Sequence, residues 1–181
     1  MQLLKLGTCL FALAMTAGAA WGQKITTDFS PTGDFDSYKT FMWIQQPQDE
    51  NRAMVLRTVA TELTAKGWKQ VPNGADVGVA ANVASQKDRS LDTFYSGVQG
   101  WNWRRWDVAD TSSSDIEKYS AGTVVVDMFD GKSHRLVWRG IAVGAFSPKG
   151  GSDHADKDVH KMFKSFPPKW STKRSLGYGG N

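Results

Sequence analysis

The first 22 residues limit most strongly what this chain can fold into. They carry one early positive charge, Lys5, followed by an apolar run from Leu6 to Ala20 that ends in small residues. This layout is typical of a secretory signal peptide. The apolar run, about fifteen residues long, is too short for a membrane-spanning helix, which needs roughly twenty. We therefore expect an exported protein, periplasmic or extracellular, without a transmembrane segment.

Cleavage is expected after Gly22, with Ala19 and Ala20 as alternative cut points. The remaining chain, about 159 residues, is long enough for one domain with a substantial core. Cys9 is the only cysteine and leaves with the leader, so packing alone must stabilise the fold. Cys9 also lies inside the apolar run rather than at its end, which argues against a lipid anchor.

The charge balance excludes one class of partner. The whole chain carries a net charge of +4, and loss of Lys5 lowers it to about +3. Basic and acidic residues are spread evenly, without the concentrated positive footprint of nucleic-acid-binding proteins. We therefore expect no nucleic acid as a partner.

Hydrophobic periodicity predicts the order of the elements. Alternating apolar positions predict strands over residues 24–29, 38–44, 68–71, 76–85, 123–130 and 135–145. Apolar residues at helical spacing predict helices over 52–66 and 153–166, with Gly67 and Pro167-Pro168 as stop signals. The dipeptide Asp130-Gly131 predicts a tight hairpin between the last two strands.

These elements predict an α+β domain over residues 23–168. We expect a mainly antiparallel sheet of about six strands with the two helices packed on one face. Residues 169–181 are polar, basic and glycine-rich without an apolar period, which predicts a disordered tail.

Three stretches together resemble a known family. They are Asp34–Trp43, the run Gly122–Asp127 with Val137–Gly140, and the closing Phe166–Pro168. Their order and spacing resemble the bacterial exported family catalogued as domain of unknown function 4136, over nearly the whole mature chain. The resemblance implies an α/β domain of the cell envelope, frequently a lipoprotein, with no established activity. This chain departs from the lipoprotein members because no cysteine stands at the cleavage point.

The segment between Asp88 and Ala121 is the first candidate for a binding site. It combines large aromatic rings with arginines, which suits stacking on sugars or contact with a membrane surface. The alternative is that these rings fold back onto the sheet, since several exposed rings need a partner. The candidate ligand-binding residues are Phe94, Tyr95, Trp101, Trp103, Arg104, Arg105 and Trp106.

A second candidate lies at the start of the last predicted helix. Asp156 and His160 are four residues apart, as are His154 and Asp158, so each pair shares a helix face and has metal-binding side chains. Lys157 and Lys161 oppose a cation, and a solvated acidic helix start explains the same residues. We expect no metal site here.

Motifs of enzymes are missing from the sequence. It contains no G-x-S-x-G, no phosphate loop, no dinucleotide fingerprint and, after cleavage, no thiol. We expect a non-enzymatic binding or structural module without a cofactor, whose partner is an envelope protein or glycan. The alternatives are an envelope hydrolase with a site assembled from distant residues, and a glycan- or membrane-binding protein that uses the aromatic segment.

Overall fold

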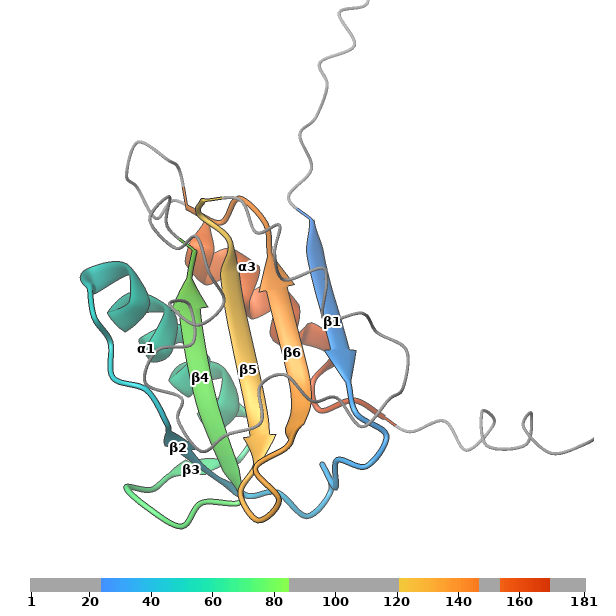
Figure 1. Ribbon diagram of the computed structural model, residues 1–181. Coiled ribbons are helices and arrows are strands. Elements are labelled where there is room, and N and C mark those ends of the chain that lie inside the picture. Colours follow the sequence, from blue (N-terminus) through green and yellow to red (C-terminus); the bar gives the residue numbers. More distant parts are fainter. Residues whose placement is uncertain (1–23, 85–120, 147–153, 170–181) are drawn as a thin grey trace, which may run out of the picture.

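The computed structural model describes residues 24–84, 121–146 and 154–169. They form one six-stranded sheet with two helices against it (Figure 1). The strands are β1 (Ile25–Phe29), β2 (Thr40–Trp43), β3 (Lys69–Gln70), β4 (Val77–Val83), β5 (Val124–Asp130) and β6 (Leu136–Ala142). The helices are α1 (Glu50–Ala65) and α3 (Ala155–Met162), and a 3₁₀ turn, η2 (Phe163–Ser165), continues α3.

The sheet is mixed, which corrects the expectation of a mainly antiparallel one. Its order is β1-β6-β5-β4-β2-β3. The pairs β1–β6, β6–β5 and β5–β4 are antiparallel, whereas β2 runs parallel to both β4 and β3. The cause is α1, which follows β2 and returns the chain to the end of the sheet where β2 began, so that β3 and β4 repeat the direction of β2. The α+β class is confirmed.

Helix α1 has clear start and stop signals. The carboxylate of Asp49 accepts a hydrogen bond from the backbone N–H of Arg52 at 2.8 Å and caps the first turn. At the other end Gly67 adopts the left-handed conformation, φ 87°, and Trp68 donates its backbone N–H to the carbonyl of Leu63. The predicted apolar stripe, with Val59 fully buried, is the face that packs on the sheet.

Both helices cover the same face of the sheet, as expected (Figure 1). Val126 and Met128 of β5 point into this layer and join the hydrophobic core with side chains of α1 and α3. Aromatic rings pack together in the part of the core beside η2. The ring centroid of Trp138 lies 5.2 Å from that of Phe163 and 5.5 Å from that of Phe166. Each such ring contributes several kcal/mol, about 3–5 on replacement by alanine.

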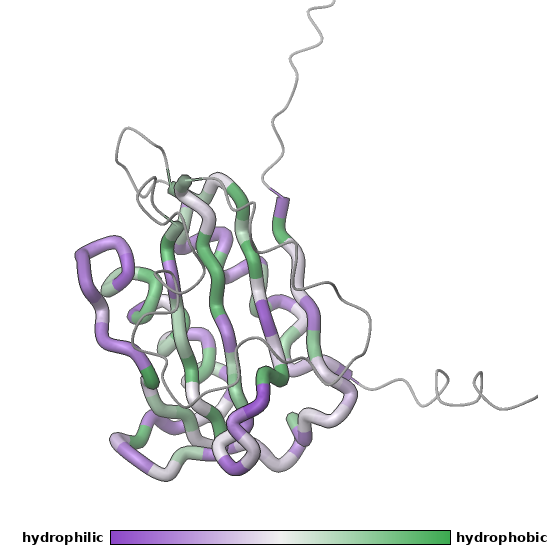
Figure 2. Tube along the Cα trace, in the orientation of Figure 1, coloured by the Kyte–Doolittle hydropathy of each residue, from purple (hydrophilic) through white to green (hydrophobic). Residues whose placement is uncertain are grey.

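The opposite face of the sheet is also buried, and it holds a polar pair. Val125 and Phe129 of β5 are 1% and 0% exposed on that side. Between them Asp127 meets Arg139 of β6 in a buried ion pair. Figure 2 shows hydrophobic colouring concentrated on the central strands and hydrophilic colouring gathered in the turns.

The connection between β5 and β6 is longer than the tight turn predicted at Asp130-Gly131. β5 ends at Asp130 and β6 begins only at Leu136. His134 adopts a left-handed conformation, φ 57°, and donates its backbone N–H to the carbonyl of Asp130. The aspartate itself holds the turn, because its Oδ1 accepts from both the backbone N–H and the hydroxyl of Ser133.

Candidate functional site

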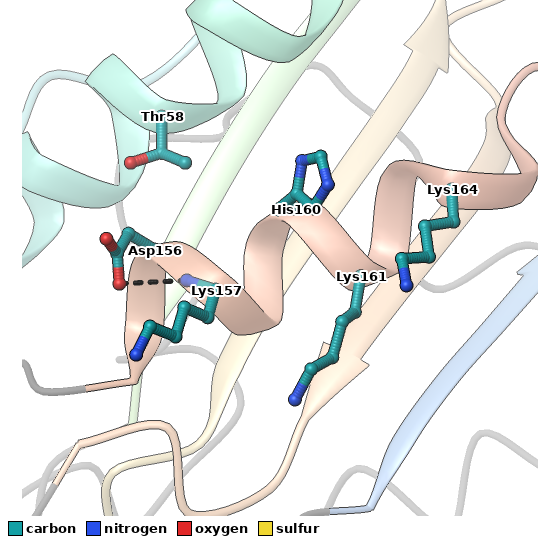
Figure 3. A pocket seen from close by; sticks show the side chains of 6 residues that line it. All are labelled: Thr58, Asp156, Lys157, His160, Lys161 and Lys164. Carbon is teal, nitrogen blue, oxygen red and sulfur yellow. Dashed lines mark hydrogen bonds between the residues drawn. The ribbon is translucent and has the colours of Figure 1, made fainter.

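A shallow hollow of about 480 Å³ opens on the helical side of the molecule. Five of its six lining residues come from α3 and η2, and the sixth, Thr58, comes from α1 (Figure 3). The lining residues are Thr58, Asp156, Lys157, His160, Lys161 and Lys164. All are polar, and three carry a permanent positive charge.

The helical period explains why the basic residues gather here. Val159, Met162 and Phe163 are buried to 1% exposure or less against the sheet and α1. Because these three residues face the core, the residues on the opposite side of the helix point to solvent. Lys157 and Lys161 therefore lie four residues apart on the exposed face of α3, and η2 extends the row to Lys164.

Two of the basic residues, His160 and Lys161, already have carboxylate partners. His160 bonds through Nδ1 to Oε1 of Glu62 on α1 at 2.7 Å, and this contact joins the two helices. Lys161 donates to Oδ1 of Asp158 at 3.0 Å; that carboxylate is fully buried, so Lys161 neutralises it. The contact of Lys161 with Asp158 accounts for one of the three lysine charges in the hollow.

The other two lysines present their charge to solvent. Asp156 turns its Oδ1 to the backbone N–H of Lys157, 2.8 Å away, rather than to an ammonium group (Figure 3). In the described parts of the chain neither Lys157 nor Lys164 forms an ion pair. The hollow therefore presents two ammonium groups that form no ion pair among the described residues, beside the carboxylate of Asp156, and is suited to hold an anionic group that both ammonium groups approach from α3 and η2.

The metal candidates of the sequence do not assemble into a ligand set. Asp158 and His160 are engaged by Lys161 and Glu62, and Asp156 by the helix backbone. Over residues 24–84, 121–146 and 154–169 no group of three or more metal-binding side chains lies together.

The aromatic candidates lie outside the described residues, so the structure does not test them. This applies to Phe94, Tyr95, Trp101, Trp103, Arg104, Arg105 and Trp106. The predicted signal peptide and the tail beyond Lys169 lie outside them as well. Within the described ranges no helix has the length and apolarity needed to cross a membrane.

A second polar cluster, at the end of the sheet where β2 and β4 begin, is structural. Oδ2 of Asp76 accepts hydrogen bonds from the backbone N–H groups of Lys39 and Thr40 and from the Thr40 hydroxyl, at 2.8–2.9 Å. The donation from Lys39 is the largest cause of a lowered pKa of the Asp76 carboxyl. The cluster ties together the starts of the two parallel strands.

Tyr38 and Asp130 complete this cluster with a hydrogen bond of 2.9 Å from the phenol to Oδ2. Burial, then this bond and the charge of Asp130, raise the pKa of Tyr38. Burial also opposes ionisation of Asp130, but hydrogen bonds from Ser133, Tyr38 and Lys132 outweigh it and hold the pKa of Asp130 below its usual value.

The row of lysines was missed at the level of sequence. Lys157 and Lys161 were noted there only as charges that oppose a metal ion. The signal was present: once Val159, Met162 and Phe163 are assigned to the core face, the exposed face follows from the helical period.

The fold and the hollow define a small α+β domain with a mixed sheet and a basic helix on its outer side. The chain belongs to the family described as "Domain of unknown function (DUF4136)", whose model matches residues 25–168. A comparison with curated protein sequences finds no match.

Solved structures resemble the fold. A DUF4136 family protein from Bacteroides thetaiotaomicron is 16% identical, with a TM-score of 0.55 over 80% of this chain and 94% of that chain. A PDZ domain protein from Parabacteroides distasonis is 18% identical, with a TM-score of 0.49 over 81% of this chain and 36% of that one. A PelC dodecamer from Paraburkholderia phytofirmans is 10% identical, with a TM-score of 0.43 over 78% and 94%. The first likeness concerns the fold alone. The other two structures, with TM-scores below 0.5, are too distant to support a conclusion about this chain.

Proposed function

We propose that this chain is an exported protein of the bacterial cell envelope that works as a non-enzymatic binding module, and that the hollow on α3 binds an anionic group. The observation that carries the proposal is the pair of exposed lysines, Lys157 and Lys164, that line one hollow without a carboxylate partner among the described residues. Export is supported by the charged start and short apolar run before residue 23.

Binding of this kind needs no catalytic group. An ammonium group attracts a carboxylate or phosphate as a point charge, and two of them on one rigid helix act together. Because the side chains are exposed, each contact is worth up to about 1 kcal/mol, so the site suits a ligand with several charges.

The test is a titration of the purified protein with inorganic tripolyphosphate, followed by ¹H–¹⁵N NMR. We expect the largest shifts at the amides of Lys157, Lys161 and Lys164, and we expect added salt to weaken them. Shifts of equal size around Lys69 and Lys132, which are exposed lysines on β3 and the β5–β6 turn, would contradict the proposal. So would unchanged α3 amides.

Export is tested separately by fractionation. The mature chain is expected in the periplasmic or culture fraction with its N-terminus near residue 23. A full-length chain in the cytosol, with Met1 retained, would contradict this part of the proposal.

One alternative is an envelope hydrolase with a site assembled from distant residues. The other is glycan or membrane binding through the aromatic segment around Trp101–Trp106, which lies outside the described ranges.

A further inference from the structure

The walls of the hollow are those of a site for an extended chain rather than for an enclosed small molecule. Pockets that take small ligands are concave and bury most of the ligand's surface. Here the hollow is shallow, and its lining residues on α3 and η2 are exposed. A ligand would therefore lie across the hollow and make contacts along its length.

The lysines form a row that matches a repeated charge. Lys157, Lys161 and Lys164 follow one another along the axis by four and three residues (Figure 3). Because Lys161 is paired with Asp158, the two lysines of the row outside ion pairs among the described residues are Lys157 and Lys164, whose backbone positions lie about 11 Å apart along the axis at the rises of an α-helix and a 3₁₀ turn. Acid groups repeated along a polymer at a similar spacing can each approach one ammonium group without the polymer having to bend.

Further hydrogen-bonding groups lie beside this row. Thr58 of α1 contributes a hydroxyl that donates to the carbonyl of Met54 and keeps acceptor capacity. His160 uses Nδ1 for Glu62, and among the described residues its Nε2 has no hydrogen-bond partner. Hydroxyl and imidazole groups next to ammonium groups suit a ligand that alternates acid groups with hydroxyls.

A membrane surface fits less well than a soluble polymer. Helices that bind at a bilayer interface bury an apolar face in it. The apolar face of α3, with Val159, Met162 and Phe163, is already buried in the core of this protein. Only the charges of the helix would face the lipid.

We infer that the hollow on α3 binds an acidic glycan, an extended sugar chain with repeated carboxylates, held by Lys157 and Lys164 with Thr58 and His160 beside them. This inference depends on the proposed function, because it names the ligand of the same site.

The experiment compares hexagalacturonate, neutral maltohexaose and phosphatidylglycerol vesicles by calorimetry at low salt. We expect binding of hexagalacturonate and none of maltohexaose. The variant Lys157→Gln with Lys164→Gln should weaken that binding about tenfold. Lys161 is left in place because it neutralises the buried Asp158.

The matched control is Lys69→Gln with Lys132→Gln, which removes the same charge from exposed positions away from α3. It should leave the affinity within about twofold. Unfolding midpoints of both double variants, measured in urea, establish that each is folded.

The outcomes separate the two proposals. Equal weakening by both double variants, or binding of vesicles without binding of hexagalacturonate, would overturn the glycan inference. Tripolyphosphate shifts on α3 without any hexagalacturonate binding would overturn it too, while leaving the proposed function in place. Absence of any α3 response to tripolyphosphate and hexagalacturonate alike would overturn both.

Discussion

Asp127 and Arg139 face each other across β5 and β6 and form two hydrogen bonds, 2.6 Å from Nε to Oδ1 and 2.9 Å from Nη2 to Oδ2. The two side chains are 1% and 6% exposed. This bidentate geometry compensates both charges at the centre of a sheet face where water is nearly excluded.

Removing one member of this pair should be costly. Asp127→Ala leaves a buried guanidinium without its carboxylate, and we expect a loss of about 3–5 kcal/mol in the free energy of unfolding, measured in urea. The double variant Asp127→Leu with Arg139→Met should lose clearly less than the sum of the single changes. Arg57→Ala, which breaks an exposed pair with Glu50, serves as the control and should cost less than about 1 kcal/mol. A similarly small effect for Asp127→Ala would contradict the structural role of the pair.

Two glycines in the left-handed conformation should respond very differently to alanine. Gly122 has φ 86°, and an added methyl would collide with the backbone carbonyl of Phe146. Gly144 has φ 74° and open space around that position. We expect Gly144→Ala to cost about 1–2 kcal/mol for the backbone conformation alone, and Gly122→Ala to cost more. Thermal unfolding of the two variants measures the difference, and equal losses would rule out the collision.

Acid should weaken the fold through Asp76. Its pKa is lowered in the folded protein, so its contribution to stability is complete above the unfolded value of about 3.9 and is lost as the pH falls through the folded pKa. We expect the urea midpoint to fall steeply below about pH 4. Asp76→Asn should be less stable at pH 7 and should show a shallower decline. A decline as steep as in the parent protein would assign the acid sensitivity to other carboxyls.

Alkali should weaken the fold through Tyr38. The raised pKa favours the neutral phenol in the folded state, so its contribution is complete below the unfolded value of about 10 and is lost as the pH rises above it. Tyr38→Phe removes the hydrogen bond to Asp130 and should cost about 1 kcal/mol at pH 7. Between pH 9 and 11 its stability should change less than that of the parent protein. Fluorescence-detected unfolding across this range is the measurement.

The positions of most elements could be predicted from the sequence because each buries one face with a clear period. The stripe of Val55, Val59 and Leu63 predicted α1 to within two residues at its start and one at its end. Trp138, on one of the predicted strands, is 2% exposed, whereas Trp43, on another, is only partly buried. Periodicity indicates which residues face the core. Near the edge of a sheet, however, a side chain that faces the core remains partly exposed to solvent.

The direction of β2 could not be derived from its alternation, because a strand pattern reads the same in either direction. The information lay in the helix that separates residues 40–43 from 77–83, since such a crossover joins parallel strands. The hydrogen bonds of Asp76 to Lys39 and Thr40 connect residues 36 and 37 positions apart, and local pattern carries no trace of such contacts.

Strand β1 has a partner that lies far along the chain: Ile25 pairs with Ala142 and Phe29 with Trp138. A chain exported from its N-terminus delivers β1 first and β6 only when most of the domain has followed. The edge of the sheet thus stays open until then, and contacts of such long sequence separation form late. Under the proposed export, this order of delivery would keep β1 unpaired during the passage and would let the sheet gain this edge strand only on the far side.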